Sequence, residues 1–162
     1  MNTGLVRWLL ICLLGLWLSG CGLHMRGAVN IPPEYQKVQL LGDDKSDLYR
    51  MVASRLKRVG IQLVEGQSDV PQLTLGAIQV TNQVASVDSH SQAVEYIMLF
   101  NTRYTLTLPG HEPQSFNASF NRSFLNKSSE ALASSREQEQ LTYEMLLQTA
   151  DLIIIQLSRL KY

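Results

Sequence analysis

The side chains of this chain that could do chemistry are few and far apart in the sequence. Its three histidines are too widely separated for the spacings that hold zinc; they are His24, His90 and His111. Asp43, Asp44 and Asp47 could be metal ligands, but a helix that begins beside them explains them better, because aspartate caps helices and favours their positive end. We therefore expect neither a metal ion nor another cofactor.

Motifs of known catalytic machinery are also missing from the sequence. It has no G-x-S-x-G turn, no phosphate-binding glycine loop and no H-E-x-x-H pair. Glu137, Glu139 and Glu144 fall on a predicted helix, whose solvated face accounts for them. We expect a protein that is not an enzyme; the alternative is an acid and a base that are distant in sequence and converge in space.

Composition excludes two further classes of protein. The 14 Lys and Arg residues balance 14 Asp and Glu residues, so the chain is not a polybasic nucleic-acid binder. Apolar residues make up 45% of the chain, and 13 of the first 20 positions are apolar, which leaves an ordinary globular content for the remainder. This distribution excludes a multi-pass membrane protein and sets residues 1–20 apart.

Residues 1–20 have the pattern of a secretory signal peptide that is removed from the mature protein. Arg7 supplies a single positive charge, and the apolar run from Trp8 to Leu18 is too short to span a bilayer. The segment ends in Leu18-Ser19-Gly20-Cys21, which resembles the lipobox of bacterial lipoproteins. The resemblance implies that Cys21 carries a diacylglycerol and an N-acyl chain; the alternative is an ordinary export signal that leaves Cys21 as a free or disulfide-bonded thiol.

An acylated Cys21 would tether the mature domain to a membrane without embedding it. Residues 21–34 contain Ile31-Pro32-Pro33, which disfavours a helix, and we expect them to form a lipidated linker before a single domain at 35–162. Gly22 stands where lipoproteins retained at the inner membrane typically carry Asp. By that resemblance, the chain is anchored to the periplasmic side of the outer membrane of a Gram-negative cell.

The first elements of the predicted domain are short. Alternating apolar residues predict a strand over 35–41, and apolar residues at helical spacing predict a helix that Asp44 or Ser46 caps and Gly60 ends. A second short strand is expected over 61–64, followed by a polar turn over 66–71.

A long β-hairpin is predicted next. Apolar residues of the first strand change phase once near Gly76-Ala77, as a β-bulge would produce. Seven residues of the second strand share even parity: Val94, Tyr96, Met98, Phe100, Tyr104, Leu106 and Leu108. The second strand would have about fifteen residues and a length on the order of 50 Å, more than a small domain needs to cover its core. We therefore expect the hairpin to protrude, with its turn at 88–92.

A last strand and a helix complete the predicted domain. Apolar residues from Phe116 to Phe124 alternate with small polar ones, which are Ser115, Asn117, Ser119, Asn121 and Ser123. The aromatic face is expected to pack in the core; a platform that stacks nucleic-acid bases is the alternative. The polar face is either solvated or hydrogen-bonded to a partner. An amphipathic helix with a capping box at Ser134 and Glu137 ends the chain.

This order of elements resembles the LPS-assembly lipoprotein LptE family. Residues 21–27 look like that family's C-G-[FW]-H-L-R start, and further matches follow in the family's order along essentially the whole chain: Pro71-Gln72-Leu73-Thr74-Leu75-Gly76, Glu95-Tyr96, Leu108-Pro109-Gly110, Arg122-Ser123-Phe124, Ala131-Leu132-Ala133 and Glu144-Met145. The resemblance implies an α+β fold with a sheet of about four strands, a long hairpin, and two helices packed on one face.

The resemblance also implies a function. Members of this family plug the lumen of the LptD β-barrel as a 1:1 heterodimer, and the two proteins place lipopolysaccharide in the outer leaflet of the outer membrane. Such a plug needs a hydrated surface that forms hydrogen bonds, and the face from Ser115 to Ser123 fits that need. The alternative, of a different class, is a free-standing periplasmic lipoprotein that binds a lipid or peptidoglycan in a cleft between sheet and helix.

The family is also credited with binding lipopolysaccharide directly. The phosphates of lipid A would require cations, and the candidates are Arg103, Arg122, Lys127 and Arg136. The alternative for each is an ordinary surface or partner-facing cation. Removing Arg7 with the signal peptide leaves 13 basic against 14 acidic residues, so the net charge does not favour a phosphate-rich ligand over the barrel partner.

Overall fold

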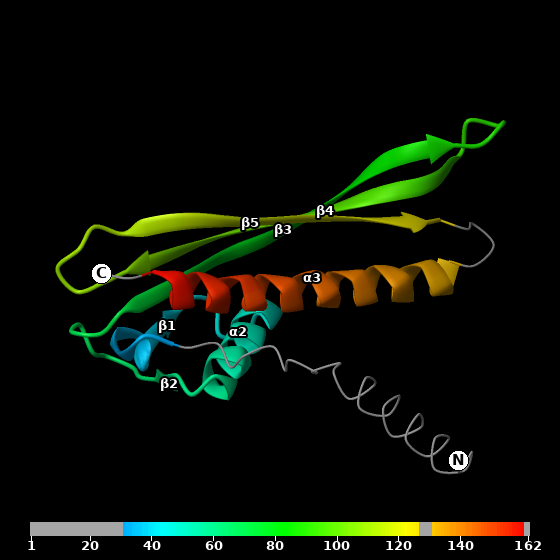
Figure 1. Ribbon diagram of the computed structural model, residues 1–162. Coiled ribbons are helices and arrows are strands. Elements are labelled where there is room, and N and C mark those ends of the chain that lie inside the picture. Colours follow the sequence, from blue (N-terminus) through cyan, green and yellow to red (C-terminus); the bar gives the residue numbers. More distant parts are fainter. Residues whose placement is uncertain (1–30, 127–130, 161–162) are drawn as a thin grey trace, which may run out of the picture.

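The computed structural model describes residues 31–126 and 131–160 of the chain. Five strands form one mixed sheet in the order β2-β1-β3-β4-β5, and the helices α2 and α3 lie on one face of it (Figure 1). The elements in chain order are η1 (Pro33–Tyr35), β1 (Lys37–Leu41), α2 (Asp47–Arg58), β2 (Gln62–Leu63), β3 (Gln72–Val87), β4 (Ala93–Thr107), β5 (Gln114–Leu125) and α3 (Ala131–Arg159). The α+β prediction is confirmed, and the sheet has five strands instead of about four because the two-residue β2 adds to one edge.

The short elements at the start of the described chain anchor one end of the sheet. A prolyl 3-10 turn precedes β1 and buries the Tyr35 side chain completely, so the first strand begins at Lys37 and not at residue 35. β1 pairs in parallel with both β2 and β3. Of the two predicted caps for α2, Ser46 is the one found, because its hydroxyl accepts a hydrogen bond from the backbone N–H of Tyr49 at 3.2 Å.

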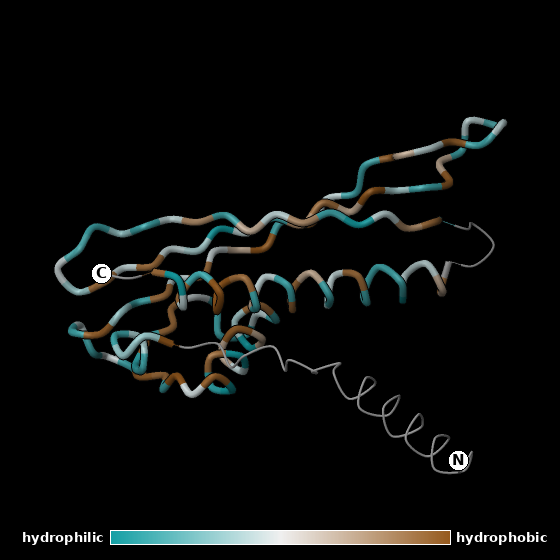
Figure 2. Tube along the Cα trace, in the orientation of Figure 1, coloured by the Kyte–Doolittle hydropathy of each residue, from teal (hydrophilic) through white to brown (hydrophobic). Residues whose placement is uncertain are grey.

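The long hairpin consists of β3 and β4, and its turn lies between Val87 and Ala93 as predicted. The pairing register shifts between Leu75 and Ile78, which confirms the phase change at Gly76-Ala77. Two further shifts near the hairpin tip, from Val84 to Ser86 and from Ser86 to Val87, were not predicted. Hydrophobic and hydrophilic residues are interspersed along the hairpin (Figure 2), with a continuous apolar run over residues 97–100 of β4. The tip of the hairpin projects beyond the helix layer (Figure 1). The protrusion expected from the strand length is therefore observed.

The core lies between the sheet and the two helices. Three ring pairs across β4 and β5 line it, with centroids 5.4–6.4 Å apart: Tyr96–Phe124, Phe100–Phe120 and Tyr104–Phe116. This packing supports the core interpretation of the aromatic face of β5 over a base-stacking platform. Burial raises the pKa of Tyr104 above its ordinary value of 10.0, which keeps its phenol neutral within the core.

The predicted capping box of the last helix is wrong. α3 begins at Ala131, so Ser134 lies inside the helix, where it is only 5% exposed, and does not cap it. The residues before Ser134, namely Ala131, Leu132 and Ala133, are strong helix formers, so the helix already includes them when it reaches the local Ser-x-x-Glu signal.

Candidate functional site

The face of the sheet opposite the helices is polar across three strands. Pairing sets Ser115, Asn117, Ser119, Asn121 and Ser123 of β5 beside Thr105, Arg103, Asn101, Leu99 and Ile97 of β4, in that order. β3 adds Gln79, Thr81 and Gln83 beside Asn101, Leu99 and Ile97. Because residues paired across strands point to the same side of a sheet, these thirteen side chains form one surface, which we call the outer face.

Neutral hydrogen-bonding groups dominate the outer face. All five β5 residues of the predicted polar face, from Ser115 to Ser123, are exposed on it. The hydroxyls of Thr105 and Ser115 lie 2.9 Å apart, within hydrogen-bond distance. Hydroxyl and amide groups both donate and accept hydrogen bonds, so such a face can replace water with the polar groups of a partner. It avoids the larger desolvation cost that a densely charged face would carry.

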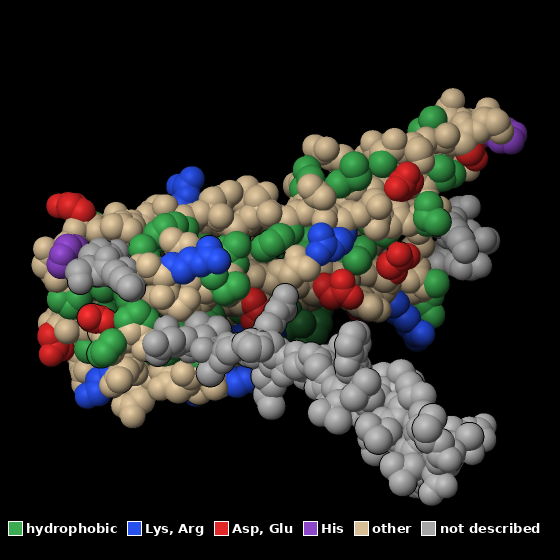
Figure 3. Space-filling model, in the orientation of Figure 1, with side chains coloured by type: hydrophobic (Ala, Val, Ile, Leu, Met, Phe, Trp, Pro, Cys, Tyr) green, Lys and Arg blue, Asp and Glu red, His purple; other side chains and the backbone are tan. Residues whose placement is uncertain are grey.

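The candidate cations do not gather at one place. Arg103 is exposed on the outer face beside Asn117, whereas Arg122 pairs with Met98 on the helix side of the sheet and donates from Nη1 to the carbonyl of Asn121 at 2.7 Å. Arg136 is exposed on α3, and Lys127 lies outside the described residues. On the face seen in Figure 3, lysine and arginine side chains are scattered over the surface. The three candidate arginines that the structure describes therefore belong to three different surfaces.

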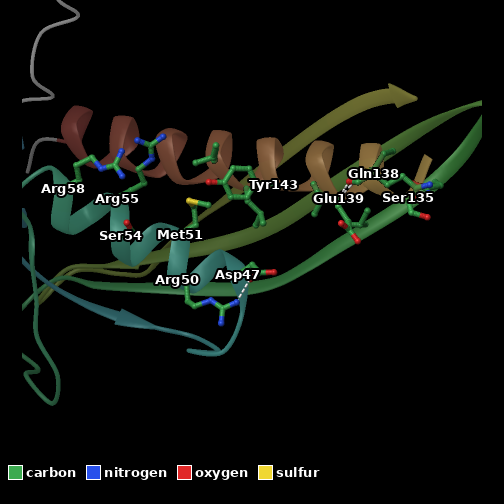
Figure 4. A pocket seen from close by; sticks show the side chains of 16 residues that line it. Asp47, Arg50, Met51, Ser54, Arg55, Arg58, Ser135, Gln138, Glu139 and Tyr143 are labelled. Atoms are coloured by element: carbon green, nitrogen blue, oxygen red, sulfur yellow. Dashed lines mark hydrogen bonds and ion pairs between the residues drawn. The ribbon is translucent and has the colours of Figure 1, made fainter. Parts of the chain in front are cut away.

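An open groove of about 1080 Å³ lies between α2, α3 and the helix side of β3 and β4. Its apolar lining includes Met51, Val80, Met98 and Leu146, and three arginines of α2, namely Arg50, Arg55 and Arg58, lie along it (Figure 4). Arg50 forms an ion pair with Asp47, and Arg55 Nε lies 3.2 Å from Asp151 Oδ1 on α3. None of these arginines is a candidate in the sequence analysis. The spacing of positions 50, 54 and 58 places them on one side of a helix but does not show that α3 lies opposite.

The remaining titratable residues that the structure describes lie at several separate places in the fold. In the ranges 31–126 and 131–160, no three His, Cys, Asp or Glu side chains lie close enough to hold a metal ion. Asp43 accepts a hydrogen bond from the backbone N–H of Lys45 at 3.1 Å and Asp47 pairs with Arg50, so both serve the start of α2. His90 occupies the hairpin tip and His111 the turn between β4 and β5. Cys21 lies outside the described residues.

A membrane-spanning helix is not found in the described part of the chain, because neither α2 nor α3 combines the length and apolarity that crossing a bilayer requires.

Comparison with protein families gives a match over most of the chain. The model of the family described as "LptE: Lipopolysaccharide-assembly" matches residues 28–157. The chain is 31% identical to the LPS-assembly lipoprotein LptE of Photorhabdus laumondii over 92% of its own length and 83% of that protein. It is 28% identical to the LPS-assembly lipoprotein LptE of Yersinia enterocolitica, over 90% of its length and 73% of that protein.

Solved structures show the same fold. The crystal structure of the rare lipoprotein B from Shewanella oneidensis matches with a TM-score of 0.69 and 32% identity, covering 74% of this chain and 91% of that one. An uncharacterized lipoprotein B from Nitrosomonas europaea, at 14% identity and a TM-score of 0.62, supports the fold alone; the match covers 85% of this chain and 90% of that one.

Proposed function

The chain belongs to the LptE family of lipopolysaccharide-assembly lipoproteins, and from this premise we propose that it plugs and assembles an LptD-type β-barrel in the outer membrane. In this role it forms a 1:1 heterodimer with the barrel and helps it insert lipopolysaccharide into the outer leaflet. It acts by binding and not by catalysis. Cys21 carries the lipid anchor that holds it on the periplasmic side, and residues 1–20 are removed as the signal peptide.

The observation that carries this proposal is the outer face. A barrel lumen is polar, and a plug that fits it must present groups that bond to hydrated strands over an extended surface. The outer face offers such groups on three adjacent strands, centred on Ser119 and its partner Asn101. Arg103 is its one charged residue, and its many uncharged hydroxyl and amide groups suit a lumen that supplies both donors and acceptors.

Co-purification tests the proposal. The full lipidated chain, extracted from outer membranes with mild detergent, should be recovered with an LptD-type barrel at a ratio of one to one. A chain that is reproducibly recovered alone from membranes that contain the barrel would count decisively against it. Mass spectrometry of the same sample should find acyl chains on Cys21, and replacing Cys21 with Ala should release the chain from the membrane fraction.

Lipopolysaccharide binding is a finer proposal within this role. Arg103 is the strongest of the candidate cations, because it is exposed on the outer face among amides that could bind sugar hydroxyls. Arg103→Ala should weaken binding of purified lipopolysaccharide, whereas Arg136→Ala, which removes an exposed arginine from α3, should leave it within about twofold. Equal losses in both variants would place the contact elsewhere.

The groove between α2 and α3 favours a second candidate function, a free-standing lipoprotein that binds a periplasmic lipid or peptidoglycan. Its apolar floor at Met98 and Leu146 and its bordering arginines suit an amphiphile with an anionic head. A stable monomer that retains lipid through purification, with no barrel partner, would support this candidate over the plug.

A further inference from the structure

β3 has one side that no described strand covers. β1 pairs with β3 only as far as Thr74, and β4 occupies the other side of β3 along its whole length. From Ile78 to Val84 the pairing with β4 is regular, so the opposite edge of these seven residues is regular as well. In a strand of this kind, alternate residues direct their N–H and C=O groups away from the paired neighbour. The result is a straight row of hydrogen-bonding backbone groups roughly 24 Å long.

This edge lacks the features that usually prevent an exposed strand from pairing with another chain. Residues 76–87 contain no charged residue and no proline, and valine, isoleucine and threonine recur along them. The two other edges of the sheet differ: β2 has only two residues, and β5 carries Arg122, whose guanidinium already bonds a backbone carbonyl. An uncharged, proline-free edge of this length is prone to pair with another polypeptide, so we expect it to be covered in the working protein.

Side chains beside the edge indicate what covers it. Val80 and Val84 lie on the helix side of β3 and are 41% and 56% exposed, although their β4 partners Phe100 and Tyr96 are turned toward the core. Val80 also borders the groove between α2 and α3, where Met98 lies beside it. A strand added next to β3 would cover these valines and direct its own apolar side chains into the groove.

We propose that the free edge of β3 from Ile78 to Val84 pairs with an extended, uncharged strand of the partner polypeptide. An extended polypeptide alone supplies N–H and C=O groups at the spacing of this edge; a lipid or a sugar does not. The neutral edge selects a segment without charged residues there, with apolar side chains toward α2 and α3 and polar ones toward the outer face. The inference rests on the proposed function, since the LptD-type barrel supplies the strand.

Residue-resolved amide hydrogen exchange tests this pairing. The full lipidated chain is compared alone in detergent and in complex with its LptD-type barrel. In the complex, the alternate amides of residues 78–84 that point away from β4 should exchange at least about tenfold more slowly. The free edge of β5 serves as the reference, because general exclusion of water inside the partner would slow both edges equally, whereas an added strand slows β3 selectively.

Each outcome has a defined consequence. If the complex forms and the β3 amides exchange at unchanged rates, or slow no more than those of β5, the strand proposal is overturned and the barrel partnership stands. If the amides are already protected in the chain alone and the protection rises with its concentration, a second copy covers the edge and the proposal is also overturned. If no complex forms, the proposed function fails, and the strand proposal fails with it.

A pair of matched variants gives an independent readout. Val84→Lys introduces a charge on the β3 edge at a residue that is 56% exposed, and Ile155→Lys introduces the same charge on α3 at a residue that is 42% exposed and lies away from the sheet edges. The first should reduce the barrel recovered with the chain about tenfold, and the second should change it by less than about twofold. Both substitutions are at exposed positions, so thermal unfolding of the free chain should be unaffected. Recovery of Val84→Lys at the wild-type level would contradict the proposal.

Discussion

The β-bulge at Gly76 provides a test of how the long hairpin is held in register. A Cβ atom built on Gly76 would lie 2.7 Å from the carbonyl oxygen of Arg103, which belongs to the backbone of the paired strand and cannot rotate away. The Thr102 hydroxyl is within hydrogen-bond distance of the carbonyls of Gly76 and Ala77, at 3.3 and 3.2 Å, and ties the bulge to β4. Gly76→Ala must therefore push β3 and β4 apart where Gly76 faces the backbone of Arg103.

The expected cost follows from that clash. Overpacking a rigid site costs about 1–3 kcal/mol, so Gly76→Ala should lower the free energy of unfolding by about 2 kcal/mol. For a domain of this size the melting temperature should fall by roughly 8 °C. Thermal unfolding of the full chain in mild detergent, followed by circular dichroism, measures this change.

Gly110→Asn is the matched control for this prediction. It also adds a Cβ to a glycine, but at a φ of 75° that asparagine tolerates and with no atom within 4 Å of the new Cβ. The control should melt within about 2 °C of the wild type. If Gly76→Ala is as stable as Gly110→Asn, the close approach of the two strands does not set the register, and the reasoning is refuted.

Three further changes have defined outcomes. Phe100→Pro should break β4, because proline has no backbone N–H to donate to the neighbouring strand, and should reduce barrel recovery far more than Phe100→Leu does. Normal assembly of the proline variant would exclude the hairpin as a main docking element. Ser46→Ala should lower the free energy of unfolding by about 1 kcal/mol in a urea titration, since it removes the acceptor for the Tyr49 N–H, and Ser46→Asp should restore it. Burial raises the pKa of Tyr104 above 10.0, so the unfolded chain loses the phenol proton first as pH rises, and the contribution of Tyr104 to stability is complete below pH 10 and is lost above it. Urea titrations above pH 10 should therefore show a smaller decline in the free energy of unfolding for Tyr104→Phe than for the wild type. An equal decline in both proteins would show that other groups cause it.

Local patterns in the sequence predicted the hairpin well. The apolar residues at even positions from Val94 to Leu108 identify the helix side of β4, although Ile97 and Leu99 on the other side are apolar as well. The phase change at Gly76-Ala77 locates the first register shift, but the shifts near the hairpin tip were not predicted. The same parity identifies the β5 residues of the outer face. Each of these features depends on neighbours within a few positions, which a sequence pattern contains.

Features that depend on distant parts of the chain were not predictable in this way. The groove exists because α2 and α3 lie side by side and Arg55 meets Asp151, which is 96 positions away. The free edge of β3 exists because β1, which pairs with it in parallel, is too short to pass Thr74. The start of α3 was misplaced for the opposite reason, because a local capping signal was overridden by the helix-forming residues before it.

Photo-crosslinking from the outer face is the most direct test of the central claim that this face docks inside the barrel. A photoreactive amino acid replaces Ser119 on the outer face or Lys57 on α2, both exposed, in cells that produce the LptD-type barrel. We predict crosslinks from position 119 to lumen-facing residues of the barrel and few or none from position 57. Crosslinks from position 57 alone, or none from position 119 in cells with an assembled barrel, would contradict the account.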